Sequence, residues 1–196
     1  MEAETETMTD GGVAGNARLT AAVAVALLVL LAAEGATIPF IGRLLGPHIF
    51  LGMLLVPPVM MKLGSTGYRF ARYYSHSPAY VRRGPPHLAL RSLAPGVVLT
   101  TIALFGTGVA LLVQGPPSNT LRFAHKLSFI AWVALISLHV LGHLLELPRL
   151  ALADWRRGEE AIGGAGARTA ALAAALLTGI AVALLTLPLA SAWLAD

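Results

Sequence analysis

The stretch LRFAHKLSFIAWVALISLHVLGHLLE, residues 121–146, decides the fold that we expect for this chain. Its apolar length is that of a helix able to cross a bilayer, about 20 residues, yet it contains His125, His139 and His143. At 100° per residue the three histidines share one face of such a helix, with His125 and His139 about 21 Å apart along its axis. Because an ionisable side chain inside a membrane is costly, these histidines are candidates for a functional site.

The overall composition is that of a membrane protein. Of the 196 residues, 56% are hydrophobic and 12% are charged, whereas soluble domains carry about 25% charged residues. The absence of cysteine excludes disulfides, thiolate-bound iron–sulfur clusters and haem attached through cysteine. The net charge of +4 comes from basic residues beside apolar segments, so membrane topology explains it better than nucleic acid does.

The order of apolar segments predicts an all-α integral membrane helical bundle with five transmembrane helices. Residues 1–17 are acidic and Gly-rich, and we expect them to form a disordered cytoplasmic tail before a transmembrane domain at 18–196. Pro57 and Pro58 are expected to kink the second span. The spans are expected at about 19–38, 48–64, 93–113, 121–147 and 169–193.

The distribution of Lys and Arg predicts the orientation. By the positive-inside rule, the connections richest in arginine lie in the cytoplasm. The N-terminus then lies in the cytoplasm and the C-terminus outside, in a multi-pass protein of a bacterial inner (plasma) membrane. The arginines of the two long connections are Arg69, Arg72, Arg82, Arg83, Arg91, Arg149, Arg156, Arg157 and Arg168. The basic residues of the opposite side are Arg43, Arg122 and Lys126.

Two histidines are expected at the same depth on the outer side. His48 opens the second span and His125 lies near the start of the fourth, and both spans run from outside to inside. Alternate helices of an up-down bundle face each other across its core, and two facing imidazoles suit a six-coordinate haem iron. The glycines that would leave room for a flat macrocycle are Gly52, Gly106 and Gly108. The basic residues placed to pair with haem propionates are Arg43, Arg122 and Lys126.

The first four spans, residues 21–147, resemble the four-helix haem bundle of membrane cytochromes b, including the membrane subunits of bacterial hydrogenases and formate dehydrogenases. The phrase HIFLGMLLVPPVMMKLGSTGYRF, residues 48–70, is also similar to small actinobacterial membrane cytochromes. In cytochromes b, helices two and four each carry two haem-ligating histidines about fourteen residues apart. The resemblance implies haem b as the cofactor, with His125 and His139 as the helix-four ligands and His48 as the outer ligand of helix two.

One position departs from that pattern, because Lys62 stands fourteen residues after His48. The inner haem is therefore absent, or its second ligand is His76 or His87 from the following loop, or Lys62 itself. We expect one outer haem and leave open a second one held by His139. A single histidine in a span is more often a hydrogen-bonded packing residue than a ligand, so the prediction depends on the matched set.

The leading functional hypothesis is a b-type haem cytochrome that transfers electrons between the quinone pool and a separate oxidoreductase subunit. Glu34, in the outer third of the first span, either accepts a proton from a quinol or pairs with Arg43. Two alternatives remain: a haem-free membrane anchor or scaffold, and a membrane enzyme with a histidine-bound metal. A transporter is disfavoured because the sequence shows no inverted repeat. The histidines of such a metal enzyme would be His76, His87, His139 and His143.

Overall fold

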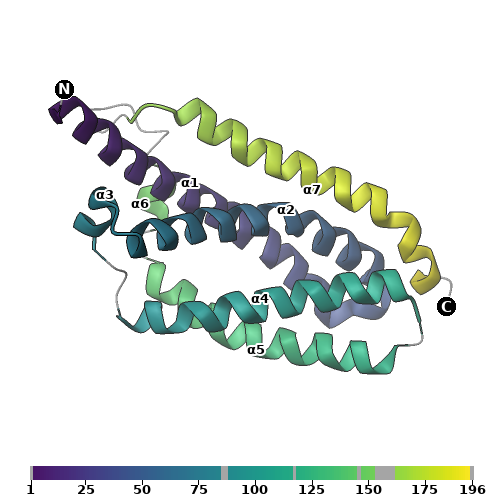
Figure 1. Cartoon of the computed structure of the whole chain (residues 1–196). Coiled ribbons are helices and arrows are strands. Elements are labelled where there is room, and N and C mark those ends of the chain that lie inside the picture. Colours follow the sequence, from purple (N-terminus) through teal and green to yellow (C-terminus); the bar gives the residue numbers. More distant parts are fainter. Residues whose placement is uncertain (1, 85–87, 117, 145–146, 153–161, 195–196) are drawn as a thin grey trace.

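A computed structural model of the chain describes residues 2–84, 88–116, 118–144, 147–152 and 162–194, and these residues form helices and short connections without a strand. The all-α prediction is therefore confirmed for this part of the chain. The long helices lie roughly side by side (Figure 1). In chain order the elements are α1 (Glu2–Thr37), the 3-10 turn η1 (Ile38–Phe40), α2 (Ile41–Tyr74), α3 (Pro78–Arg82), α4 (Leu88–Gln114), α5 (Asn119–His143), α6 (Leu147–Ala151) and α7 (Ala165–Leu194).

Four helical segments among the described residues are long and apolar enough to cross a membrane: Gly12–Tyr74, Leu88–Gln114, Asn119–His143 and Ala165–Leu194. The first of them, 63 residues long, joins α1, η1 and α2. In Asn119–His143 only 6% of the most apolar window is buried inside the chain. The remaining apolar surface is available for contact with membrane lipid.

Helices α1 and α2 form an antiparallel hairpin that turns at η1 (Figure 1). Far from the turn, Asn16 donates a hydrogen bond to the carbonyl of Ser65 at 3.2 Å, and the Thr20 hydroxyl donates to the Ser65 hydroxyl at 3.0 Å. Between these polar contacts and the turn, apolar side chains fill the helix interface. The buried members of this cluster are Val23, Leu27, Leu55 and Val59.

The interruption of α2 lies at Leu44, where the backbone leaves the helical region (φ −110°, ψ 21°). Pro47 follows three residues later; it has no N–H to donate, and its ring crowds the preceding turn. The kink expected at Pro57 and Pro58 is not found as a break, because helical backbone angles continue through both prolines.

Helix α7 packs antiparallel along α2 and supports the turn that contains these prolines. Pro58 cannot donate to the carbonyl of Leu54, four residues earlier. At that carbonyl α7 approaches most closely, since a Cβ added to Gly179 would collide with the Leu54 oxygen. A glycine Cα–H beside a carbonyl oxygen is a weak hydrogen-bond donor. The prolines therefore free a backbone group that faces the neighbouring helix.

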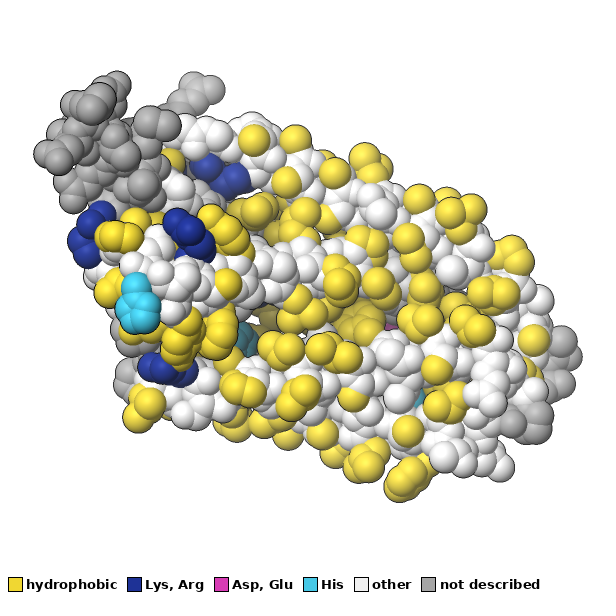
Figure 2. All heavy atoms as spheres, in the orientation of Figure 1, with side chains coloured by type: hydrophobic (Ala, Val, Ile, Leu, Met, Phe, Trp, Pro, Cys, Tyr) yellow, Lys and Arg dark blue, Asp and Glu magenta, His cyan; other side chains and the backbone are white. Residues whose placement is uncertain are grey.

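Helices α4 and α5 form a second antiparallel pair. A Cβ on Gly96 would lie 3.1 Å from Leu135, and the buried Trp132 indole donates to the Thr101 hydroxyl at 3.0 Å. This pair meets the group formed by α1, α2 and α7 along α2 and α4, whereas α5 packs closely on α4. The face shown in Figure 2 is hollowed between α2 and α4.

Helix α1 begins at Glu2, and the disordered tail expected at residues 1–17 stays a prediction. Arg18 follows this segment and is buried, with 7% of its surface exposed. The charge analysis of the loops had not included this arginine. Arg156 and Arg157 lie outside the described residues.

Candidate functional site

The structure brings His48 of α2 and His125 of α5 together. Their ring centroids lie 6.4 Å apart and the ring planes are nearly perpendicular, at 84°. His48 stands one residue after Pro47, where α2 resumes its course beyond the interruption at Leu44. The kink therefore lies next to one of the two histidines.

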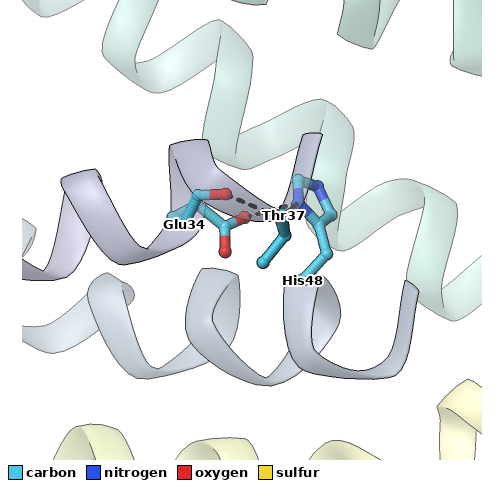
Figure 3. Close-up of polar contacts among 3 residues, drawn as sticks. All are labelled: Glu34, Thr37 and His48. Atoms are coloured by element: carbon cyan, nitrogen blue, oxygen red, sulfur yellow. Dashed lines mark hydrogen bonds and ion pairs between the residues drawn. The ribbon is translucent and has the colours of Figure 1, made fainter. Parts of the chain in front are cut away.

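The Nδ1 atom of His48 is held by α1. It lies 2.9 Å from the Thr37 hydroxyl and 2.9 Å from Oε1 of Glu34 (Figure 3). The Thr37 hydroxyl donates its own hydrogen to the carbonyl of Glu34 at 2.6 Å, so its oxygen is free to accept. A carboxylate only accepts. With Glu34 ionised, the hydrogen-bond geometry assigns the proton of His48 to Nδ1 and the lone pair to Nε2.

The Nδ1 atom of His125 is held in a similar way by α4. It lies 3.1 Å from the Thr107 hydroxyl, and that hydroxyl donates to the carbonyl of Ala103 at 2.7 Å. The Thr107 oxygen thus accepts the Nδ1 proton of His125, which leaves Nε2 with its lone pair. A histidine that binds a metal typically donates its other ring N–H to such an acceptor.

The spacing of the two rings suits one metal ion between them. An imidazole nitrogen binds a transition metal at about 2.0 Å, and two such bonds in line place the ring centroids roughly 6 Å apart. Among the described residues no group of three or more His, Cys, Asp or Glu side chains could hold a metal. The donor set is therefore a pair of imidazoles, which fits a haem iron because the macrocycle supplies the other four ligands.

The three glycines expected to leave room for a macrocycle differ in what surrounds them. A Cβ on Gly108 would lie 3.3 Å from Cε1 of His125, so this glycine lets the His125 ring pack against α4. A Cβ on Gly52 would lie 3.7 Å from Oε1 of Glu34, whereas one on Gly106 would meet nothing within 4 Å. Gly52 therefore makes room for the Glu34 carboxylate, and Gly106 faces open space.

The basic residues expected to bind propionates are not gathered around the two histidines. Arg43 and Lys126 are exposed. The Arg122 guanidinium lies over the ring of Trp193, 4.7 Å from its centroid, and the Trp193 indole donates to the carbonyl of Leu111 at 3.2 Å. The end of α7 therefore contacts α4 and α5, although the cytochrome b resemblance covers only the first four spans.

His139 has no imidazole opposite it on α2, whose histidine is His48. The His139 and His143 rings contact each other, with centroids 4.9 Å apart, and Nδ1 of His139 is buried without a hydrogen-bond partner among the described residues. Lys62, fourteen residues after His48, donates to the carbonyl of Thr20 at 2.9 Å. Its amine is thus bound to α1.

The loop histidines do not complete the inner site within the described residues. His76 is exposed and adopts a left-handed backbone conformation with φ 58°. The amide of Ser77 donates to the carbonyl of Arg72 and that of His76 to the carbonyl of Tyr73, which is the Schellman pattern of a helix end. His76 therefore forms the turn after α2. His87 lies outside the described residues.

Glu34 pairs with His48, and the alternative pairing with Arg43 is not observed because Arg43 is exposed. The other carboxylate oxygen of Glu34, Oε2, is buried and has no hydrogen-bond partner among the described residues. Thr37 and Thr107, which fix the two rings, were missed by the sequence analysis. The signal available for Thr107 was its place between Gly106 and Gly108.

The part of the chain that the structure describes is all-helical with four long apolar segments, which is compatible with a multi-pass membrane protein. Its candidate site is a pair of imidazoles between α2 and α5. Comparison with family models, with curated proteins and with solved structures finds no match for this chain.

Proposed function

We propose that this chain is a b-type haem cytochrome of a bacterial inner membrane, with His48 and His125 as the two axial ligands of one outer haem. The observation that carries the proposal is the pair of rings 6.4 Å apart whose Nδ1 atoms are both engaged by α1 or α4. Because both Nδ1 atoms are engaged, Nε2 is the nitrogen of each ring that is left to bind a metal. The resemblance to membrane cytochromes b agrees with it.

When bound, haem supplies a one-electron carrier whose potential depends on its ligands and its burial. The chain's own residues hold the two rings 6.4 Å apart. We propose that electrons pass between the quinone pool and a separate oxidoreductase subunit. Oε2 of Glu34, buried and without a partner among the described residues, is the atom available to a quinol hydroxyl.

The proposed membrane topology has five passes. Because α1 and α2 form an antiparallel hairpin, each would cross the bilayer once, with η1 on the outer side. Figure 2 shows basic side chains gathered at the end of the molecule where α3 lies. The positive-inside rule assigns that end to the cytoplasm, which puts the N-terminus inside and the C-terminus outside.

We propose one outer haem per chain and leave open a second one held by His139, because His87 lies outside the described residues. Lys62 is bound to the Thr20 carbonyl, and His76 forms an exposed turn. Neither is placed to complete a second pair with His139.

The test is a pyridine haemochrome assay with protein quantitation on the purified chain in detergent. We expect about one haem b per chain, lost in His48→Ala and in His125→Ala. The matched control is His76→Ala, which removes an exposed histidine from the turn and should keep the haem. A chain without haem after expression with adequate haem supply would overturn the proposal and favour a haem-free anchor.

A further inference from the structure

Glu34 is the only carboxylate among the side chains that the structure describes. It lies within an apolar segment, with 14% of its side chain exposed. A charged group in such surroundings is costly unless it has a partner. Its partner is the Nδ1–H of His48, 2.9 Å from Oε1. A buried carboxylate placed on a candidate ligand indicates a role toward that ligand.

The two histidines differ in what holds them. His48 donates to the Glu34 carboxylate and the Thr37 hydroxyl together, whereas the acceptor at His125 is the neutral hydroxyl of Thr107. A carboxylate that accepts from Nδ1–H raises the basicity of the opposite ring nitrogen. Hydrogen bonds to a charged acceptor are also stronger than those to a neutral one. His48 is therefore the stronger electron donor of the pair.

The local fold keeps this contact in place. Thr37, at the end of α1, donates to the backbone carbonyl of Glu34 at 2.6 Å. This hydrogen bond links the two residues whose side chains contact His48. Gly52 lies one turn after His48, and its missing side chain leaves room beside Oε1 of Glu34. Both features orient the carboxylate toward the ring of His48 (Figure 3).

We propose that Glu34 is a positioning residue that fixes His48 as a ligand through Nε2 and lowers the reduction potential of the site. This inference rests on the proposed haem. A negative charge near the iron favours its oxidised, more positive form, and a more basic axial ligand acts in the same direction. The electronic difference between the two ligands therefore comes from the different acceptors that α1 and α4 present to them.

The test compares the midpoint potentials of the purified wild type, Glu34→Gln and Thr107→Val by redox titration of the haem absorbance. Gln keeps the shape and an acceptor oxygen but removes the charge, so we expect a more positive midpoint with the low-spin spectrum of a bis-histidine haem retained. Thr107→Val removes the neutral acceptor at the other ligand and should shift the midpoint less. An unchanged midpoint in Glu34→Gln, or a shift no larger than in Thr107→Val, would overturn the inference.

A second pair of variants decides the matter if Glu34→Gln does not accumulate. Glu34→Asp shortens the carboxylate and should shift the midpoint to more positive values, whereas Thr37→Val leaves the carboxylate and should shift it less. The reverse order would overturn the inference. A wild-type chain without haem would overturn the proposed function and this role together. A haem-containing wild type with an insensitive Glu34 would overturn only this role.

Discussion

The amine of Lys62 donates a hydrogen bond to the carbonyl oxygen of Thr20, 2.9 Å away on the neighbouring helix. Lys62 lies fourteen residues after His48, which under the proposed cytochrome b-like arrangement is the position of an inner ligand. The contact binds the side chain to α1, while Nδ1 of His139 remains without a partner among the described residues.

This relationship predicts the effect of restoring the histidine. In Lys62→His an imidazole would replace the amine and offer a second ligand to pair with His139, so we expect the haem content to rise from about one to about two per chain. Lys62→Ala is the matched control and should keep about one. A haemochrome assay measures both, and a Lys62→His chain that still holds one haem would contradict the expectation.

The contact between α2 and α7 predicts a stability change. Because a Cβ on Gly179 would collide with the Leu54 carbonyl oxygen, Gly179→Ala should lower the free energy of unfolding by about 1–3 kcal/mol. The control in the same helix is Gly166→Ala, where an added Cβ meets nothing within 4 Å. Thermal unfolding in detergent compares the two, and equal midpoints would refute the close approach.

The turn after α2 predicts a stabilising substitution. His76 has φ 58°, a left-handed conformation that glycine adopts at little cost. His76→Gly should raise the free energy of unfolding by about 1 kcal/mol without changing the haem content. Ser75→Gly, at φ −83°, should bring no such gain. A loss of haem in His76→Gly would instead indicate that His76 is a ligand.

The hydrogen bond between α4 and α5 predicts a third effect on stability. Thr101→Val leaves the buried Trp132 indole without its acceptor and should cost about 1 kcal/mol in a membrane helix bundle. Thr101→Ser retains the hydroxyl and should cost less. If both variants unfold at the same temperature as the wild type, the hydrogen bond does not contribute to stability.

The proposed topology can be tested with single cysteines, since the chain has none of its own. Ser75 and Asn119 are exposed residues at the two opposite ends of the proposed spans. In intact inner-membrane preparations of known orientation, a membrane-impermeant thiol reagent should label Asn119→Cys from outside and Ser75→Cys only from the cytoplasmic side. The opposite pattern would invert the topology.

The amino-acid sequence by itself determined the class of structure and which histidines share one face of a helix. Long apolar runs with few charges are helical in a membrane because every backbone group must be satisfied within the segment. Helical periodicity together with alternating span direction was sufficient to place His48 and His125 at one level. Their roles as ligands remain predictions.

Only the tertiary structure decided what surrounds those side chains. Thr37, Glu34 and Thr107 reach the two histidines from other helices, and no periodicity within one helix predicts which neighbour presents which acceptor. The break in α2 lies at Leu44, and the helix continues through Pro57 and Pro58. The carbonyl freed by Pro58 faces Gly179 of α7, a residue more than a hundred positions away. Such contacts depend on long-range packing, which determines which backbone and side-chain groups become neighbours.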